Sequence, residues 1–147
     1  MNVGVVGPRS AGKTTLIHRL SNEPVHILEP PTILTEYRRV LYDDIVIIWW
    51  DIVHPPPVHM DLLVYVTRDP DPEPLKAYPP LPTFVANLSP LPVNFNAPWR
   101  TFRVCNLSTE GIEPLLKGIL SYSKSNRTRA QGRRRRPIDS RSARVYF

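Results

Sequence analysis

The sequence predicts an α/β domain with a mostly parallel sheet and few helices. Three observations lead to this fold class. The apolar run Val3–Val6 is followed directly by a glycine-rich loop motif and a helical pattern. Several later runs are rich in β-branched and aromatic residues, and apolar residues recur at helical spacing over residues 112–120. This order of elements favours a parallel sheet whose ligand lies at the carboxyl ends of its strands.

The loop motif is the strongest functional signal in the chain. Residues 7–14 read GPRSAGKT, a complete G-x-x-x-x-G-K-T phosphate-binding loop. Such a loop aims successive backbone N–H groups at a phosphate, and the positive end of the following helix faces the same anion. In this motif class Lys13 reaches the β- and γ-phosphates and the Thr14 hydroxyl ligates Mg²⁺. The predicted phosphate-binding residues are Gly7, Arg9, Ser10, Ala11, Gly12, Lys13, Thr14 and Thr15.

The later elements are separated by proline-rich segments. The runs Glu36–Tyr42 and Ile45–Trp50 flank a short acidic turn and predict a hairpin, whose second strand is apolar on both faces as in a central strand. Nine of the 18 prolines fall between residues 70 and 98, which excludes a long helix there. The remaining predicted elements are strands at Leu62–Thr67, Thr83–Asn87 and Thr101–Cys105 and a helix that carries Ile112, Leu115, Leu116, Ile119 and Leu120.

Charge divides the chain into a body and a tail. Residues 124–147 carry nine Lys/Arg and one Asp/Glu, a net charge of +8, whereas the first 123 residues carry ten and twelve, a net charge of −2. We therefore expect a nucleotide-binding domain over residues 1–122 and a disordered arginine-rich tail over residues 123–147. The tail has three open interpretations, which are contact with nucleic acid or acidic membrane lipid, recognition by import machinery, or a solubilising role.

Cysteine content and hydropathy bear on the compartment. Cys105 is the only cysteine, which excludes an internal disulfide, and its apolar surroundings predict a buried structural thiol. The N-terminus lacks a secretory signal pattern, and no apolar run approaches the ~20 residues that span a bilayer. An intracellular protein, cytoplasmic or nuclear and without a transmembrane segment, is expected.

Two further segments extend the phosphate loop into a family resemblance. Residues 30–40 read PPTILTEYRRV and contain T-I-x-x-x-Y-R, and residues 45–51 read IVIIWWD, an apolar strand that ends in W-D. Together with the loop, these segments resemble the Ras-like small GTPases, Rab members included, over residues 1–70. The resemblance implies GTP and GDP as ligands with Mg²⁺ as the cofactor. It also implies that Thr32 and Asp51 join Thr14 around the metal ion.

The chain departs from the family where water and base are recognised. The family's D-x-x-G-Q has His54 and Pro55 in place of the glycine and glutamine, and proline cannot orient a water molecule. The family's N-K-x-D keeps Asn87 but has Leu88 and Pro90 for the lysine and aspartate, so discrimination against adenine should fall. The family's S-A-K aligns with residues 105–107, which do not match it.

Candidate catalytic groups are correspondingly few. Arg9 could act as a built-in arginine finger and His54 as a polar substitute, although a solvent-exposed arginine and an incidental loop histidine are the preferred interpretations. Reduced helices should also leave part of one sheet face exposed around Trp49, Trp50 or Tyr65 for a protein effector, unless the proline-rich segments cover it. The terminal residues contain no cysteine, so no prenyl anchor is expected.

Three functions are therefore open. The first is a divergent small GTPase that binds Mg-GTP through its phosphate loop, hydrolyses it slowly or not at all, and acts as a switch or interaction module. The second is a nucleotide-independent binding module on a GTPase fold. The third is a small ATP-binding P-loop enzyme. Competition between ATP and GTP separates the first from the third.

Overall fold

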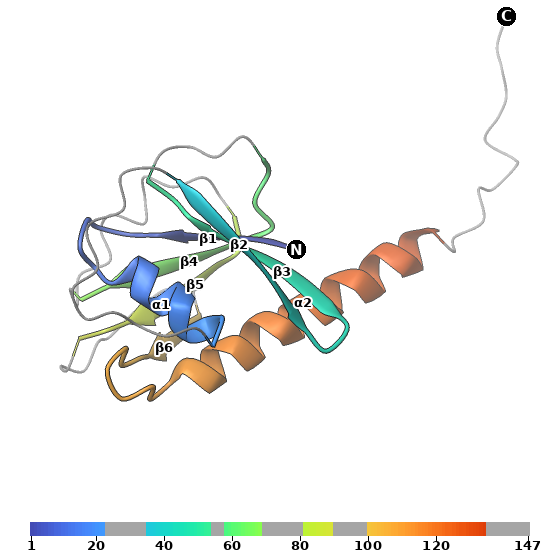
Figure 1. Ribbon diagram of the computed structural model, residues 1–147. Helices are drawn as coiled ribbons and strands as arrows, with labels where there is room; N and C mark the ends of the chain where they lie inside the picture. Colours follow the sequence, from blue (N-terminus) through green and yellow to red (C-terminus); the bar gives the residue numbers. More distant parts are fainter. Residues whose placement is uncertain (23–34, 54–57, 69–80, 90–99, 135–147) are drawn as a thin grey trace, which may run out of the picture.

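The computed structural model describes residues 1–22, 35–53, 58–68, 81–89 and 100–134 (Figure 1). Its centre is one six-stranded sheet with the strand order β2-β3-β1-β4-β5-β6. β2 pairs antiparallel with β3, and every other neighbouring pair is parallel. The predicted mostly parallel α/β sheet is therefore confirmed. The strands are β1 (Asn2–Val6), β2 (Glu36–Tyr42), β3 (Ile45–Asp51), β4 (Leu62–Thr67), β5 (Thr83–Asn87) and β6 (Arg100–Arg103).

The register of the central strands brings their carboxyl ends together. Val5 of β1 pairs with Asp51 of β3, and Val6 pairs with Tyr65 of β4. β1 therefore lies between the two strands at the point where the chain changes direction across the sheet, and ligands of open α/β sheets bind outside such a point. The burial of all six β4 residues is expected for an inner parallel strand.

Both described helices lie on the same face of the sheet. α1 (Lys13–Leu20) and the longer α2 (Ile112–Arg134) pack beside each other over the strands (Figure 1). Leu16, Ile17 and Leu20 of α1 bury their side chains in the main core, as do Leu115 and Ile119 of α2. The strands add alternate residues to this core, among them Val3, Val5, Ile47, Trp49, Leu62, Val64, Phe84 and Ala86.

No described helix covers the opposite face, which has a smaller apolar cluster of Val6, Met60, Leu63, Tyr65 and Val85. Residues 52–53 and 58–61, on either side of a short segment outside the described residues, are not helical. Ile52 and Met60 pack over Gly4 of β1, where a Cβ atom would lie 2.7 Å from Ile52 Cδ1. This arrangement agrees with the expected reduction of helices.

The expected exposure of the aromatic residues is wrong in two cases. Trp49 and Tyr65 are 0 % and 1 % exposed, because Trp49 points into the main core and Tyr65 joins the opposite cluster. Trp50 points to the face opposite Trp49, is half-buried, and lies 5.1 Å from the ring of Tyr37. The exposed aromatic surface is therefore on the β2–β3 hairpin, where Tyr37 is 65 % exposed.

α2 is longer than the sequence predicts. The expected disordered tail begins at residue 123, but residues 123–134 continue the helix (Figure 1). The physical reason is that the first turns of α2 are anchored by Leu115 and Ile119, and residues 124–131 contain no proline and several good helix formers. The predicted boundary is thus wrong for residues 123–134, and the remainder of the predicted tail lies outside the described residues. Neither described helix is long and apolar enough to cross a bilayer.

Candidate functional site

The phosphate loop occupies the carboxyl end of β1 and turns through conformations that favour glycine. Gly7 has a φ of +149°, and a Cβ atom there would lie 2.2 Å from the backbone oxygen of Val66. Gly12 has a φ of +96° and stands immediately before α1. Between them, Ser10 has a φ of +61° and the N–H of Ala11 donates to the Pro8 carbonyl at 3.2 Å. The motif therefore forms the tight turn that its glycines predict.

The loop directs the N-terminus of α1 at the same point. No described side chain caps the first turn of α1, and the first turn contains no acidic residue. The first helical hydrogen bond runs from the Leu16 N–H to the Gly12 carbonyl at 2.9 Å. An uncapped N-terminus with the positive end of the helix dipole is suited to an anion.

Lys13 lies across this loop. Its ammonium donates to the carbonyls of Gly7 and Pro8 at 3.2 and 3.0 Å. Burial lowers the pKa of Lys13, and the nearby Asp51 carboxylate partly opposes that effect. The electrostatic attraction between a phosphate and a partly desolvated lysine ammonium is stronger than the attraction between a phosphate and a fully exposed lysine. The position of Lys13 thus fits its predicted role.

Thr14 and Asp51 place two side-chain oxygen groups beside the loop. The Thr14 hydroxyl donates to a carboxylate oxygen of Asp51, which is 4 % exposed at the end of β3. The described residues contain no group of three or more His, Cys, Asp or Glu side chains that could hold a metal ion. Mg²⁺ in phosphate-transfer sites needs only one or two protein oxygen ligands together with phosphate and water. The pair formed by the partly buried Thr14 hydroxyl and the buried Asp51 carboxylate therefore fits Mg²⁺.

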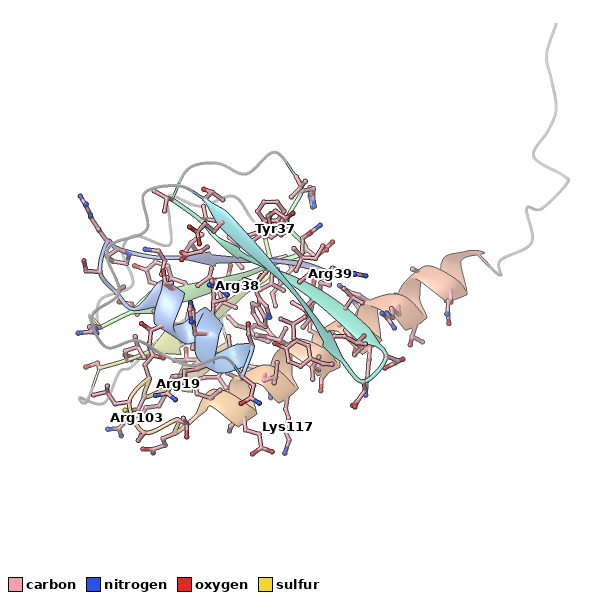
Figure 2. The ribbon with its side chains drawn as sticks, in the orientation of Figure 1. Arg19, Tyr37, Arg38, Arg39, Arg103 and Lys117 are labelled. Carbon is pink, nitrogen blue, oxygen red and sulfur yellow. The ribbon has the colours of Figure 1, made fainter. Side chains whose placement is uncertain are left out.

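A small hollow adjoins this pair on the side of β2. It is lined by Thr14, Ile17, Glu36, Arg38, Trp49 and Asp51. Arg38 bridges β2 to α1, because its Nη2 lies 3.0 Å from the Nε2 of the buried His18 (Figure 2). Thr35, at the start of the described β2 segment, accepts a hydrogen bond from the Val53 N–H at 3.1 Å. Thr35, which lies three residues after the predicted metal ligand Thr32 in the sequence, is therefore held next to the end of β3.

The loop between β6 and α2 contributes a residue that the sequence analysis missed. The Asn106 amide donates to the Gly12 carbonyl at 3.2 Å, and its Oδ1 is buried with no hydrogen-bond partner among the described residues. Arg19 reaches from α1 and donates to the Asn106 carbonyl at 2.7 Å (Figure 2). Asn106 thus ties the loop between β6 and α2 to the phosphate loop. The signal in the sequence is that Asn106 follows the last strand and falls within residues 105–107, which align with the family's S-A-K motif.

The predicted base-side residues lie nearby but are arranged differently from the expectation. Asn87 is 3 % exposed, and its Oδ1 accepts the Ser89 N–H at 2.7 Å. This carbonyl oxygen therefore stabilises the turn after β5. A Cβ atom on Gly12 would lie 3.2 Å from Leu88 Cδ1, so Leu88 packs against the phosphate loop. Cys105 is half-buried, not fully buried as expected, and a hydrogen bond with the Ser108 side chain lowers its pKa.

The structure brings most of the predicted site together. The phosphate-loop residues, Thr15 at the start of α1, Asp51 and Asn87 all lie at the carboxyl edge of the parallel strands. Arg9 is exposed, which agrees with the preferred interpretation of this residue as a solvent-exposed arginine. Thr32, His54 and Pro55 lie outside the described residues.

Comparison with protein families and curated proteins gave no match. The solved structures that share the fold include the following three. The GDP-bound Roco2 RocCORdC of Methanosarcina barkeri has 18% identity and a TM-score of 0.63 over 83% of this chain and 48% of its own. The bacterial selenocysteine-specific elongation factor EF-Sec has 17% identity and a TM-score of 0.62 over 85% of this chain and 29% of its own.

The third structure matches over nearly its whole length. It is the G domain of the T. maritima FeoB iron transporter, with 15% identity and a TM-score of 0.62 over 84% of this chain and 98% of its own. This chain spans less than half of the Roco2 and EF-Sec structures. At these identities the likeness concerns the fold alone. The chain therefore has the fold of P-loop GTPase G domains, with few helices.

Proposed function

We propose that this chain is a guanine-nucleotide-binding module that holds Mg-GTP or Mg-GDP at the carboxyl edge of its sheet. The observation that carries the proposal is the Thr14–Asp51 pair beside the uncapped start of α1. Lys13 would contact the β- and γ-phosphates and Thr15 the α-phosphate, while Thr14 and Asp51 would hold Mg²⁺. The cation would neutralise phosphate charge.

The finer proposal is a divergent Ras-like switch or interaction module. Thr32 would complete the metal site when the γ-phosphate is present, and its segment leads directly into β2. Hydrolysis would be slow or absent, because Pro55 replaces the water-positioning glutamine of the family and Arg9 is exposed. A protein effector would contact the hairpin surface around Tyr37 and Trp50.

A direct binding experiment tests the nucleotide proposal. Titration of the purified full chain with a fluorescent GTP analogue should show Mg²⁺-dependent binding that unlabelled GTP and GDP displace. ATP should compete less well than GTP, although the missing aspartate narrows the difference. Stronger competition by ATP would favour an ATP-binding enzyme. Absence of binding at micromolar protein concentration, with or without Mg²⁺, would favour a nucleotide-independent module.

Substitution of Asn106 should weaken nucleotide binding without abolishing it. Asn106→Ala removes the hydrogen bond that ties the loop between β6 and α2 to Gly12, which is worth about 1 kcal/mol, or roughly fivefold in affinity. Competition titration with GTP, GDP and ATP measures the change. The neighbouring Leu107 is 80 % exposed, so Leu107→Ala is the matched control and should leave affinity unchanged. Equal affinities for both variants would show that Asn106 does not position the site.

A further inference from the structure

The distal half of α2 carries a dense positive charge away from the nucleotide site. Beyond Ser123, the last buried residue of the helix, α2 extends past the β2–β3 hairpin (Figure 1). All but one of the side chains described over residues 124–131 are exposed. Helix residues 124–134 include no Asp or Glu, and their basic residues are Lys124, Arg127, Arg129, Arg133 and Arg134.

The basic positions surround the helix instead of forming one face. At 3.6 residues per turn, positions 124 and 127 fall on one side of the helix, and position 129 falls roughly 150° away. Residues 124–134 provide no apolar face, because Ala130 is their only apolar residue apart from Gly132. Helices that lie on a membrane need an apolar face to enter the lipid, and a flat lipid surface contacts only one side of a helix.

The groove of a double-helical nucleic acid presents the complementary arrangement. A helix that enters the major groove has a phosphate backbone on each flank, and the major groove of B-form DNA is wide enough to admit it. Four of the five basic residues are arginines, whose planar guanidinium binds phosphate oxygens through two hydrogen bonds. The charge therefore favours a polyphosphate on two sides of α2 over a membrane surface.

The rest of the molecule holds this helix in a fixed direction. Leu115 and Ile119 anchor the first turns of α2 in the core. Further along, both Nη atoms of Arg127 lie 3.4 Å from the Asp44 carbonyl at the hairpin turn, and Nη1 lies 3.6 Å from its carboxylate. This exposed ion pair is weak, and the side chains of Lys124 and Arg129 are exposed to solvent. A helix that is already formed loses less conformational entropy on binding than a disordered tail.

We propose that the distal half of α2 binds double-helical nucleic acid through phosphate contacts on two flanks, with DNA bound more tightly than RNA. The narrow major groove of A-form RNA does not admit a helix as readily. DNA and RNA duplexes both present phosphate groups, so a comparison of the affinities for the two duplexes distinguishes these ligands. This inference is independent of the proposed nucleotide site, because it uses no residue of the phosphate loop. It goes beyond the G-domain fold, which does not require a basic helix extension.

The test compares two variants of equal charge. Lys124, Arg129 and Arg133 are replaced by glutamine, which preserves helix propensity, and Arg127 is kept because it contacts the hairpin. The control replaces Arg39, Arg100 and Lys117 by glutamine, three exposed basic residues on the body (Figure 2 labels Arg39 and Lys117). Fluorescence anisotropy with a DNA duplex, an RNA duplex and anionic phospholipid vesicles is measured over a range of salt concentrations.

The wild-type chain should bind the DNA duplex with an affinity that falls as salt rises. The helix variant should lose at least tenfold in affinity, and its slope of log K against log salt should fall by about 2.7 in magnitude for three lost phosphate contacts. The control variant should retain most of the affinity and nearly all of the slope. Equal losses in the two variants, tighter binding to vesicles than to either duplex, or no binding to duplexes at low salt would each overturn the proposal.

Discussion

Lys13→Ala should reduce the affinity for a GTP analogue by about 100-fold, because hydrogen bonds to charged groups contribute roughly 1.5–3 kcal/mol and this lysine contributes charge as well. The unliganded protein should not lose stability. Burial lowers the pKa of Lys13, so the charged form is disfavoured by folding. This penalty is present below the folded-state pKa and disappears as the pH rises through the unfolded-state value. Removal of the ammonium should therefore weaken nucleotide binding without lowering the stability of the unliganded protein.

The measurement combines nucleotide titration with thermal unfolding. Lys117→Ala is the matched control, since its exposed side chain pairs only with Glu113 on the surface of α2 in the described structure. Lys13→Ala should show an unchanged melting temperature without ligand and little shift on addition of Mg-GTP, whereas the wild type and the control should both be stabilised by the ligand. Retention of wild-type affinity in Lys13→Ala would contradict the assignment of the loop as the phosphate site.

Local sequence signals predicted most of the fold because each was strong by itself. The glycines and lysine of the phosphate loop, the β-branched and aromatic residues of Glu36–Tyr42 and the apolar run of β4 each have one favourable local conformation. The parallel order of strands followed from the same signals. The extension of α2 could not be inferred from hydrophobic periodicity, because its distal half is exposed and contains no apolar pattern.

The candidate site was predictable to the extent that it is contiguous in sequence. The phosphate loop is one contiguous motif, and Asp51 was assigned because IVIIWWD resembles a family strand that ends in W-D. The tie from Asn106 to Gly12 joins residues 94 positions apart, and no local pattern encodes such a contact. The burial of Trp49 and Tyr65 likewise depends on which segments cover each face of the sheet. Long-range packing therefore accounts for the missed Asn106 contact and for the wrong exposure of the two aromatic residues.

Gly111→Ala should destabilise the protein by about 3 kcal/mol or more and lower its melting temperature by on the order of 10 °C. Gly111 has a φ of +78°, and a Cβ atom there would lie 1.8 Å from the Arg103 carbonyl oxygen. Because this obstacle is backbone at the end of β6, it cannot move without displacing the strand or the start of α2. The Leu115 N–H also donates to the Gly111 carbonyl at 3.2 Å.

Gly118→Ala provides the contrast within the same helix. A Cβ atom on Gly118 would lie 2.8 Å from Phe102 Cζ, which is the tip of a half-buried ring that can shift. Alanine gains up to about 1 kcal/mol in helix propensity over glycine, so the net change in stability should be small. Thermal and denaturant unfolding compare the two variants with the wild type. Similar losses for both would mean that the β6–α2 junction tolerates a side chain at residue 111, contrary to the close backbone approach described here.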